Sequence, residues 1–120
     1  MQNPTDVAAA WISLQRSEQE SVDASDLSWA ADEINIAAVS NPDYCWLLIR
    51  EILSQSTDDW VLANLAAGPI EAMLSLHGKA VIGRVEGLAQ ANPHFRQALG
   101  GVWNSAVESN VWSRVLRAGK

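Results

Sequence analysis

Apolar residues recur at helical spacing along most of the chain. In the segment TDVAAAWISLQ they stand at i, i+4 and i+7, the spacing of one face of an α-helix. Asn3-Pro4 precedes this segment, and asparagine suits a helix N-cap while proline suits the first helical position. The pattern predicts a helix over residues 4–16, followed by a polar, acidic connection over 17–25.

The next segment, LSWAADEINIAAV, predicts a helix over 27–39 with Ser25 or Asp26 as its N-cap. One apolar stripe is regular, but Trp29 and Ile36 fall together on a different face. A helix with two apolar faces is either central in the fold or in contact with a partner.

Asn41-Pro42 repeats the cap-plus-proline signal, and Asp43 falls in the first turn, where a carboxylate suits the helix dipole. The apolar run YCWLLI follows. By length alone this run is also compatible with a buried strand. The cap and the i, i+4 spacing of the leucines and isoleucines favour a buried central helix.

The middle of the chain reads as short helices separated by glycine and proline. A cap at 57–59 opens a helix that is expected to end at Gly68, and Pro69 restarts the helix. Gly78 is expected to close that short helix as a C′ glycine. A further helix is predicted over 79–91.

Two more helices complete the pattern. Asn92 and Pro93 predict a helix whose apolar stripe includes Phe95 and Trp103, and Ser109 is the predicted cap of the last helix.

These elements predict an all-α fold. No segment alternates with period two, and no Asn-Gly or Asp-Gly hairpin signal occurs. We expect one helical domain over 1–120, with about seven short helices in antiparallel pairs, as a compact bundle or an α-solenoid-like fragment.

Charge divides the chain into two unlike halves. Residues 1–60 carry 11 acidic and 2 basic side chains, a net −9, and residues 61–120 carry 3 and 6, a net +3, which together give the overall −6. The acidic half is unsuited to a phosphate backbone and the basic half is sparse, so no nucleic-acid partner is expected. No apolar run reaches the roughly 20 residues of a membrane span, so a cytoplasmic protein without membrane contact is expected.

Few residues suggest catalysis. Glu71 and Glu86 lie in mostly apolar segments, and with His77 they form one candidate acid–base set. The favoured interpretation is structural, with each glutamate paired to Arg84 or Arg96. No cofactor motif is present, and we predict no catalytic residues and no cofactor.

Metal and thiol chemistry are also not expected. The two histidines have no second ligand at i+3 or i+4, so no metal site is predicted, and His77 is expected to meet free carbonyls at a helix end. The single cysteine, Cys45, lies within the apolar run and is expected to be a small buried hydrophobe.

The acidic residues and two tryptophans form the predicted partner-binding surface. Trp46 and Trp103 are assigned to the core, whereas Trp29 and Trp60 lie off the main stripes beside acids and are candidate anchors. The predicted acidic members are Asp23, Asp26, Asp32, Glu33, Asp43, Asp58 and Asp59.

The stretch LAAGPIEAMLSLHG…VEGLAQANPHFRQALGGVW resembles a bacterial family of small helical domains of unknown function. The resemblance covers about residues 60–115 and implies a helical scaffold without assigned catalytic residues. Nine positions of this pattern, and Arg84 as a possible partner of the glutamates, are assigned a structural role: Gly68, Pro69, Glu71, Gly78, Arg84, Glu86, Pro93, Phe95, Arg96 and Trp103.

A small, acidic, tryptophan-rich helical chain without a catalytic site favours a non-enzymatic binding protein. The specific hypothesis is a bacterial immunity protein or inhibitor that occludes a basic toxin or effector through its acidic N-terminal half. Three alternatives remain open: a DNA-mimicking or phage-borne inhibitor, a helical adaptor or homodimer, and a small enzyme using Glu71, Glu86 and His77.

Overall fold

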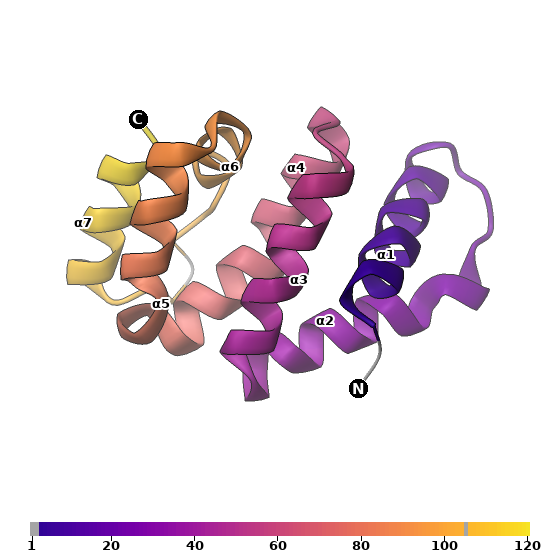
Figure 1. The fold of residues 1–120 in the computed structure, drawn as a ribbon, viewed down its shortest axis with the longest axis horizontal. Helices are drawn as coiled ribbons and strands as arrows, with labels where there is room; N and C mark the ends of the chain where they lie inside the picture. The colour runs from indigo at the N-terminus through magenta and orange to yellow at the C-terminus, as the bar shows by residue number, and fades with distance from the viewer. Residues whose placement is uncertain (1–2, 105) are drawn as a thin grey trace.

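The described residues of the computed structural model, 3–104 and 106–120, form helices joined by loops and contain no strand. The predicted all-α class is therefore confirmed. The molecule measures 40 × 27 × 24 Å along its principal axes. The elements, shown in Figure 1, are α1 (Pro4–Gln19), η1 (Ser25–Leu27), α2 (Ser28–Ser40), α3 (Pro42–Gln55), α4 (Asp59–Leu65), η2 (Ala66–Ile70), α5 (Glu71–Ala91), α6 (Pro93–Leu99) and α7 (Ser109–Ala118).

Four helices begin with the side-chain caps that the sequence predicts. The side-chain oxygens of Asn3, Asn41, Asp58 and Asn92 accept hydrogen bonds from backbone N–H groups of the first turns of α1, α3, α4 and α6. The two remaining cap predictions are wrong. Ser25 and Asp26 lie within η1, and α2 then begins without a side-chain cap. Ser109 is itself the first residue of α7.

Gly68-Pro69 does not separate two helices, contrary to the sequence-based prediction. Pro69 lies inside the π-helical segment η2, which joins α4 to α5 without a break. Proline lacks an N–H group and its ring collides with the carbonyl four residues earlier in a regular α-helix. The wider π turn relieves this conflict, so the chain bends and continues.

A helix break is present beside Gly78, as predicted, because two helical pieces of α5 meet at a kink at His77 (φ −132°, ψ 23°). Gly78 does not, however, have the positive φ of a C′ glycine. A Cβ atom at Gly78 would lie 2.9 Å from Cγ1 of Val111 in α7. The glycine is needed because α7 approaches α5 closely, which is a tertiary constraint rather than a C-cap requirement.

The buried side of α3 lies at the centre of the core. Tyr44, Cys45 and Trp46 are all buried there, with four aliphatic side chains of the same helix. Trp46 packs edge-on against Phe95 of α6 with ring centroids 5.7 Å apart, a favourable aromatic geometry. The predictions of a buried central helix and of Trp46, Phe95 and Cys45 as core residues are confirmed.

Trp103, in contrast, is wrongly assigned to the core and is 77% exposed. Helix α6 ends at Leu99, and tight turns follow, with Gly101 N–H donating to Ala98 O and Val102 N–H to Leu99 O. Because the helical register is lost there, Val102 is buried and Trp103 turns outward.

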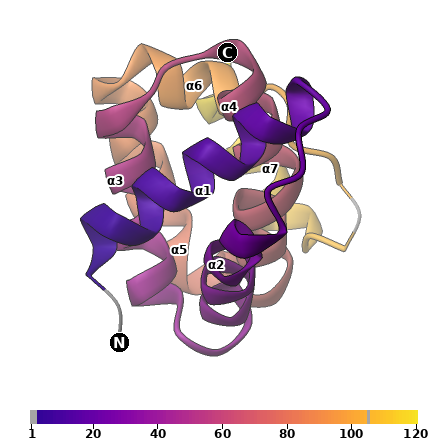
Figure 2. The ribbon, with the colours of Figure 1, turned by 90° about the vertical axis from the view of Figure 1, so that its right-hand side faces the viewer.

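Helices α7, α3 and α1 and the C-terminal half of α5 stand in a row along the long axis, and α2 runs beneath α1 and α3 (Figure 1). Seen from the α1 end, α2 lies at the bottom of the molecule and α6 at the top (Figure 2). The part of α5 after the kink runs in the same direction as α7, since Lys79 pairs with Glu108 near the starts of both and Glu86 pairs with Arg114 further along.

The close approach of α7 to α5 at Gly78 leads to a prediction about the stability of the protein. Gly78→Ala is expected to destabilise the protein by about 1–3 kcal/mol, because the added methyl overpacks against the stiff, β-branched Val111. Gly87→Ala, with nothing within 4 Å of its added Cβ, is the matched control and is expected to stabilise α5 by about 1 kcal/mol. Urea unfolding followed by circular dichroism measures both.

The Val111→Ala background checks the cause. There the cost of Gly78→Ala is expected to shrink, because the two Cγ atoms that collide with the new methyl are gone. An undiminished cost in that background would contradict the packing explanation.

Candidate functional site

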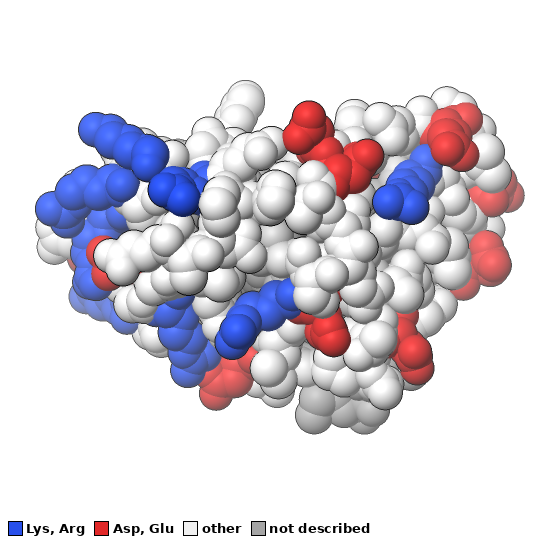
Figure 3. All heavy atoms as spheres, turned by 45° about the horizontal axis from the view of Figure 1, so that its top comes forward, with Lys and Arg blue, Asp and Glu red and all other residues white. Residues whose placement is uncertain are grey.

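Opposite charges gather at opposite ends of the molecule. Lysine and arginine side chains gather at the end formed by the C-terminal helices, while aspartate and glutamate side chains gather towards the other end (Figure 3). The uneven charge along the sequence therefore becomes an uneven charge in space. A charged partner meets a different surface at each end.

Two of the predicted partner-binding acids are engaged within the protein. Asp43 forms an ion pair with Arg84, with 2.6 Å between Oδ1 and Nη1. Glu33 accepts a hydrogen bond from the Tyr44 hydroxyl at 3.0 Å. The first contact joins α3 to α5 and the second joins α2 to α3, so both acids take part in holding the helices together.

The acids and the tryptophan at the start of α4 are also largely engaged. Asp58 caps α4, and Asp59 accepts a hydrogen bond from the Gln97 side chain at 2.9 Å. The Trp60 indole donates from Nε1 to the carbonyl of Gln15 at 2.9 Å and so ties α4 to the end of α1. The polar edge of this tryptophan is thus already used.

The acidic side chains around η1 and in α2 make fewer contacts within the protein. Asp23 accepts a hydrogen bond from the backbone N–H of Ser25. The carboxylates of Asp26 and Asp32 make no hydrogen bond or ion pair within the described residues. They are exposed and remain free to meet a partner.

Asp32 belongs to a continuous exposed strip along α2. Trp29, Asp32, Ile36 and Val39 stand at i, i+3, i+7 and i+10 and therefore share one side of the helix. Trp29 is 39%, Ile36 64% and Val39 58% exposed. These four residues are referred to below as the outer face of α2. The predicted second apolar face of this helix is thus exposed to solvent.

The structure does not bring all the predicted acids into one site. Asp43 lies at the start of α3 and Asp58 beyond its end, and a helix of 14 residues is about 21 Å long. The outer face of α2 is the part of the predicted surface that combines exposed apolar area with a free carboxylate.

Glu86 has a partner that the sequence did not indicate. Its two carboxylate oxygens accept hydrogen bonds from Nε and Nη2 of Arg114 in α7, and the Nε bond measures 2.9 Å. The predicted partners were Arg84 or Arg96, and this assignment is wrong for Glu86. The hydrogen bonds from Arg114 hold the pKa of the Glu86 carboxyl below its usual value.

The candidate acid–base residues lie apart from one another. Glu71 and Glu86 lie 15 residues apart, on opposite sides of the kink in α5. His77 lies between them at the kink, and its Nε2 lies 2.8 Å from the carbonyl of Val39 at the end of α2. That contact requires the proton on Nε2, and it confirms that the histidine meets a free helix-end carbonyl, although one belonging to another helix.

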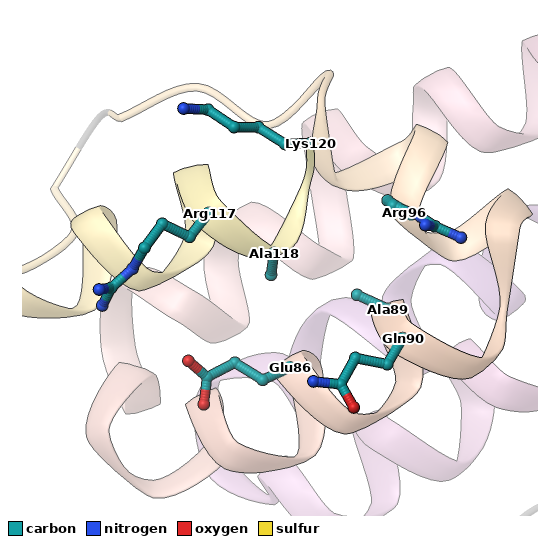
Figure 4. Close-up of a pocket in the computed structure, with 7 residues that line it drawn as sticks. All are labelled: Glu86, Ala89, Gln90, Arg96, Arg117, Ala118 and Lys120. Carbon is teal, nitrogen blue, oxygen red and sulfur yellow. The ribbon is translucent and has the colours of Figure 1, made fainter.

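A hollow of about 400 Å³ opens where α5, α6 and α7 end, and is called here the C-terminal hollow. Figure 4 shows the Glu86 and Gln90 side chains on the α5 side of this space, while the charged ends of Arg96, Arg117 and Lys120 point away from it in different directions. Its lining residues are Glu86, Ala89, Gln90, Arg96, Arg117, Ala118 and Lys120.

The described residues contain no group of three or more His, Cys, Asp or Glu side chains placed to hold a metal ion. None of the helices within 3–104 and 106–120 has the length and apolarity required to span a bilayer. Burial raises the pKa of the Cys45 thiol to about 12, so at neutral pH this sulfur is protonated and unreactive.

A family model matches residues 17–120 of the chain. The chain belongs to a family of unknown function, DUF6869. The match includes η1, α2 and α3, so the family extends well before the stretch over 60–115 in which the sequence alone suggested a relationship. No curated protein and no solved structure matches the chain.

Within this family domain, sequence reasoning missed two features. It did not pair Glu86 with Arg114, because residues 28 apart in sequence meet only once α7 has packed on α5. It also did not place Arg117 and Lys120 beside the same hollow as Arg96, which only the packing of three helix ends shows. The sequence did predict that Trp29 and Ile36 share a second apolar face of their helix.

The Glu33–Tyr44 contact predicts a pH dependence. Burial first, and then the hydrogen bond and negative charge of Glu33, raise the pKa of Tyr44 to about 12 from 10.0. The unfolded chain therefore releases this proton before the folded chain does as pH rises. The contribution of Tyr44 to stability is complete below pH 10 and is lost between pH 10 and 12.

Tyr44 is the only tyrosine, so its ionisation is measurable by absorbance near 295 nm, with circular dichroism recorded in parallel to follow folding. Glu33→Gln is expected to lower the pKa of Tyr44, because it removes the negative charge that opposes phenolate formation. Asp32→Asn is the matched control and is expected to leave that pKa unchanged. An equal shift in both variants would contradict the specific role of Glu33.

Proposed function

We propose that this protein is a non-enzymatic protein-binding module, specifically a bacterial immunity protein or inhibitor, whose outer face of α2 occludes a basic region of a toxin or effector. The observation that carries the proposal is the row of Trp29, Ile36 and Val39 exposed beside the free carboxylate of Asp32. Exposed aromatic and branched apolar side chains in one row are typical of interface anchors.

The position of α2 supports this assignment. One side of the helix is buried by Ala30, Ile34, Ala37 and Ala38 against α1, α3 and α5. The other side has no described element over it, and α2 forms the bottom of the molecule (Figures 1 and 2). A helix held by three neighbours presents its outer face at little cost in conformational entropy, which favours tight binding.

The charge of the surrounding surface supports a basic partner. Asp26 precedes the outer face and Asp32 lies within it, in the half of the chain whose net charge is −9 from 11 acidic and 2 basic side chains. Complementary charge accelerates encounter and discriminates against acidic partners. Trp60 contributes less than the sequence suggested, because its indole N–H is bound to Gln15.

Inhibition by such a module is steric. Its bound α2 would cover a basic cleft of the toxin, and the mechanism requires no reacting group on the inhibitor. This agrees with the separation of Glu71, His77 and Glu86 along α5, which leaves them without a common reaction centre.

A matched pair of variants tests the proposal. The face variant, Trp29→Ala/Asp32→Arg/Ile36→Ala, is expected to weaken binding to the partner at least about tenfold, because it removes two apolar anchors and reverses one charge. The control, Leu47→Ala/Glu20→Arg/Leu116→Ala, changes two exposed apolar residues and one exposed acid elsewhere. It has the same net charge as the face variant and is expected to bind like the wild type.

The partner is identified by affinity capture from the native host, purified, and measured by calorimetry with each variant. Protection of cells that express the partner tests the inhibitory role. A face variant that binds and protects like the wild type would overturn the assignment to α2. Displacement of the module from its partner by DNA would instead favour the DNA-mimicking alternative.

A further inference from the structure

We infer that a hollow enclosed by α1, α2, α4 and η2 is a binding site for a neutral carboxamide group, recognised chiefly by the side chain of Gln15. The hollow has a volume of about 250 Å³ and is called here the amide hollow. It shares no lining residue with the outer face of α2 or with the C-terminal hollow, so it is a site separate from the proposed protein interface. Its lining residues are Trp11, Gln15, Ala31, Asn35, Asn64, Ala67, Gly68 and Pro69.

Gln15 is an unusual residue for the buried side of α1. Ala8, Trp11 and Gln15 stand at i, i+3 and i+7 and are all buried, so Gln15 occupies a position of the core stripe. Only 6% of this residue is exposed, whereas glutamine is found mostly on protein surfaces. An apolar side chain would suit the position better for packing alone, and the presence of an amide there requires another reason.

The amide of Gln15 has no hydrogen-bond partner within the part of the chain that is described. Two polar residues are buried in that part, Gln15 and Ser56. Ser56 Oγ accepts a hydrogen bond from the N–H of Asp58 at 3.3 Å, whereas the side chain of Gln15 makes none. The backbone carbonyl of Gln15 accepts from the Trp60 indole, which fixes the residue in place. An unpaired amide in such a position costs free energy, and a ligand that pairs with it recovers that energy.

The amide of Gln15 is nevertheless within reach of a ligand. Among the described residues, no side-chain nitrogen or oxygen is both sealed from solvent and without a hydrogen bond. The two polar atoms of the Gln15 side chain are therefore accessible, although the residue as a whole is nearly buried. Because Gln15 lines the amide hollow, a ligand in that hollow can reach them.

Two further carboxamides line the same space from other helices. Asn64 of α4 donates from Nδ2 to the carbonyl of Trp60 at 2.8 Å, which leaves its Oδ1 available as an acceptor. Asn35 of α2 is exposed, and its side chain makes no hydrogen bond within the described residues. Amide side chains of three helices thus line one hollow.

The remaining wall of the hollow is the π turn η2. Ala67, Gly68 and Pro69 of this turn belong to the lining. Pro69 supplies no N–H group, which removes one hydrogen bond from the turn. π turns within helices occur frequently at functional sites, and here the turn lies beside the amide of Asn64.

The lining defines the chemistry of the ligand. It contains no Asp, Glu, Lys, Arg or His side chain, so a charged ligand would lose hydration without gaining a counter-ion. The amide of Gln15 offers a donor and an acceptor side by side, and a second carboxamide can pair with both at once. Trp11, Ala31 and Pro69 provide apolar contact for the carbon atoms of the ligand.

The size of the hollow limits the ligand to a small group. A volume of about 250 Å³ lies below the range of sites for drug-sized molecules. It suits a single glutamine or asparagine side chain of a protein partner, or a free carboxamide of similar size. Both sources present the same chemical group to Gln15.

Nuclear magnetic resonance titration of the full chain with butanamide tests the site. Saturable shifts are expected in the backbone amides of Gln15, Asn35 and Asn64. Methyl propyl ketone has the same shape without the N–H donors, and butanoate has the same shape with a charge. Both are expected to bind at least about fivefold more weakly. Equal binding of the ketone, or the absence of saturable shifts at these three residues, would overturn the inference.

A matched pair of variants tests the role of Gln15. Gln15→Met is expected to weaken butanamide binding at least about fivefold, and to leave the urea midpoint of unfolding unchanged or higher, because the lost amide has no partner in the fold. Gln19→Met, at the exposed end of the same helix, is expected to change neither. A lower midpoint for Gln15→Met would mean that the amide serves folding and would contradict the assignment. Asn35→Ala, at an exposed position, is also expected to weaken binding.

A titration of butanamide in the presence of the captured protein partner separates the two sources of the carboxamide. Loss of the butanamide shifts would assign the site to a glutamine or asparagine side chain of the partner. Unchanged butanamide binding would assign it to a free small molecule. The outer face of α2 is unaltered in Gln15→Met, so failure of the carboxamide site leaves the proposed function to its own test.

Discussion

The burial of α3 is the constraint on which the rest of the structure depends. Its side chains from Tyr44 to Leu53 are buried except for Leu47, Arg50 and the partly exposed Glu51, and a helix of this composition requires neighbours on most sides. α1, α2 and α5 supply them, and Phe95 brings α6 onto the same core through Trp46. Short helices are marginal alone, so the fixed positions of α2, α6 and α7 follow from this shared core rather than from their own helical propensity.

Local signals made the helix starts predictable, while tertiary contacts determined the features that sequence reasoning missed. Asparagine followed by proline caps a helix wherever it occurs, because the interaction involves only the next three residues. The kink at His77 lies where α5 meets the end of α2 and packs against α7. Gly78 illustrates the difference, since the sequence correctly marks a special position but the reason is the side chain of Val111, 33 residues later.

The candidate surfaces show the same division. The spacing of Trp29 and Ile36 already indicated a second apolar face on α2, because periodicity is a local property. The sequence could not show which acidic side chains remain free to meet a partner. Asp43 and Glu33 are bound by Arg84 and Tyr44, which only the fold brings near them. The C-terminal hollow could not be predicted from the sequence for the same reason. It forms only where the ends of α5, α6 and α7 meet.

The two surfaces are connected by α5 and are nevertheless expected to act independently. His77 joins α5 to the end of α2 through the Val39 carbonyl, and Glu86, further along α5, borders the hollow. A chain of contacts alone transmits nothing unless a ligand binds two arrangements of the protein with different affinity. The Arg114 contact with Glu86 and the close packing of Gly78 against Val111 hold α5 and α7 in one arrangement. The acidic end and the basic end are therefore two separate surfaces carried by one packed core.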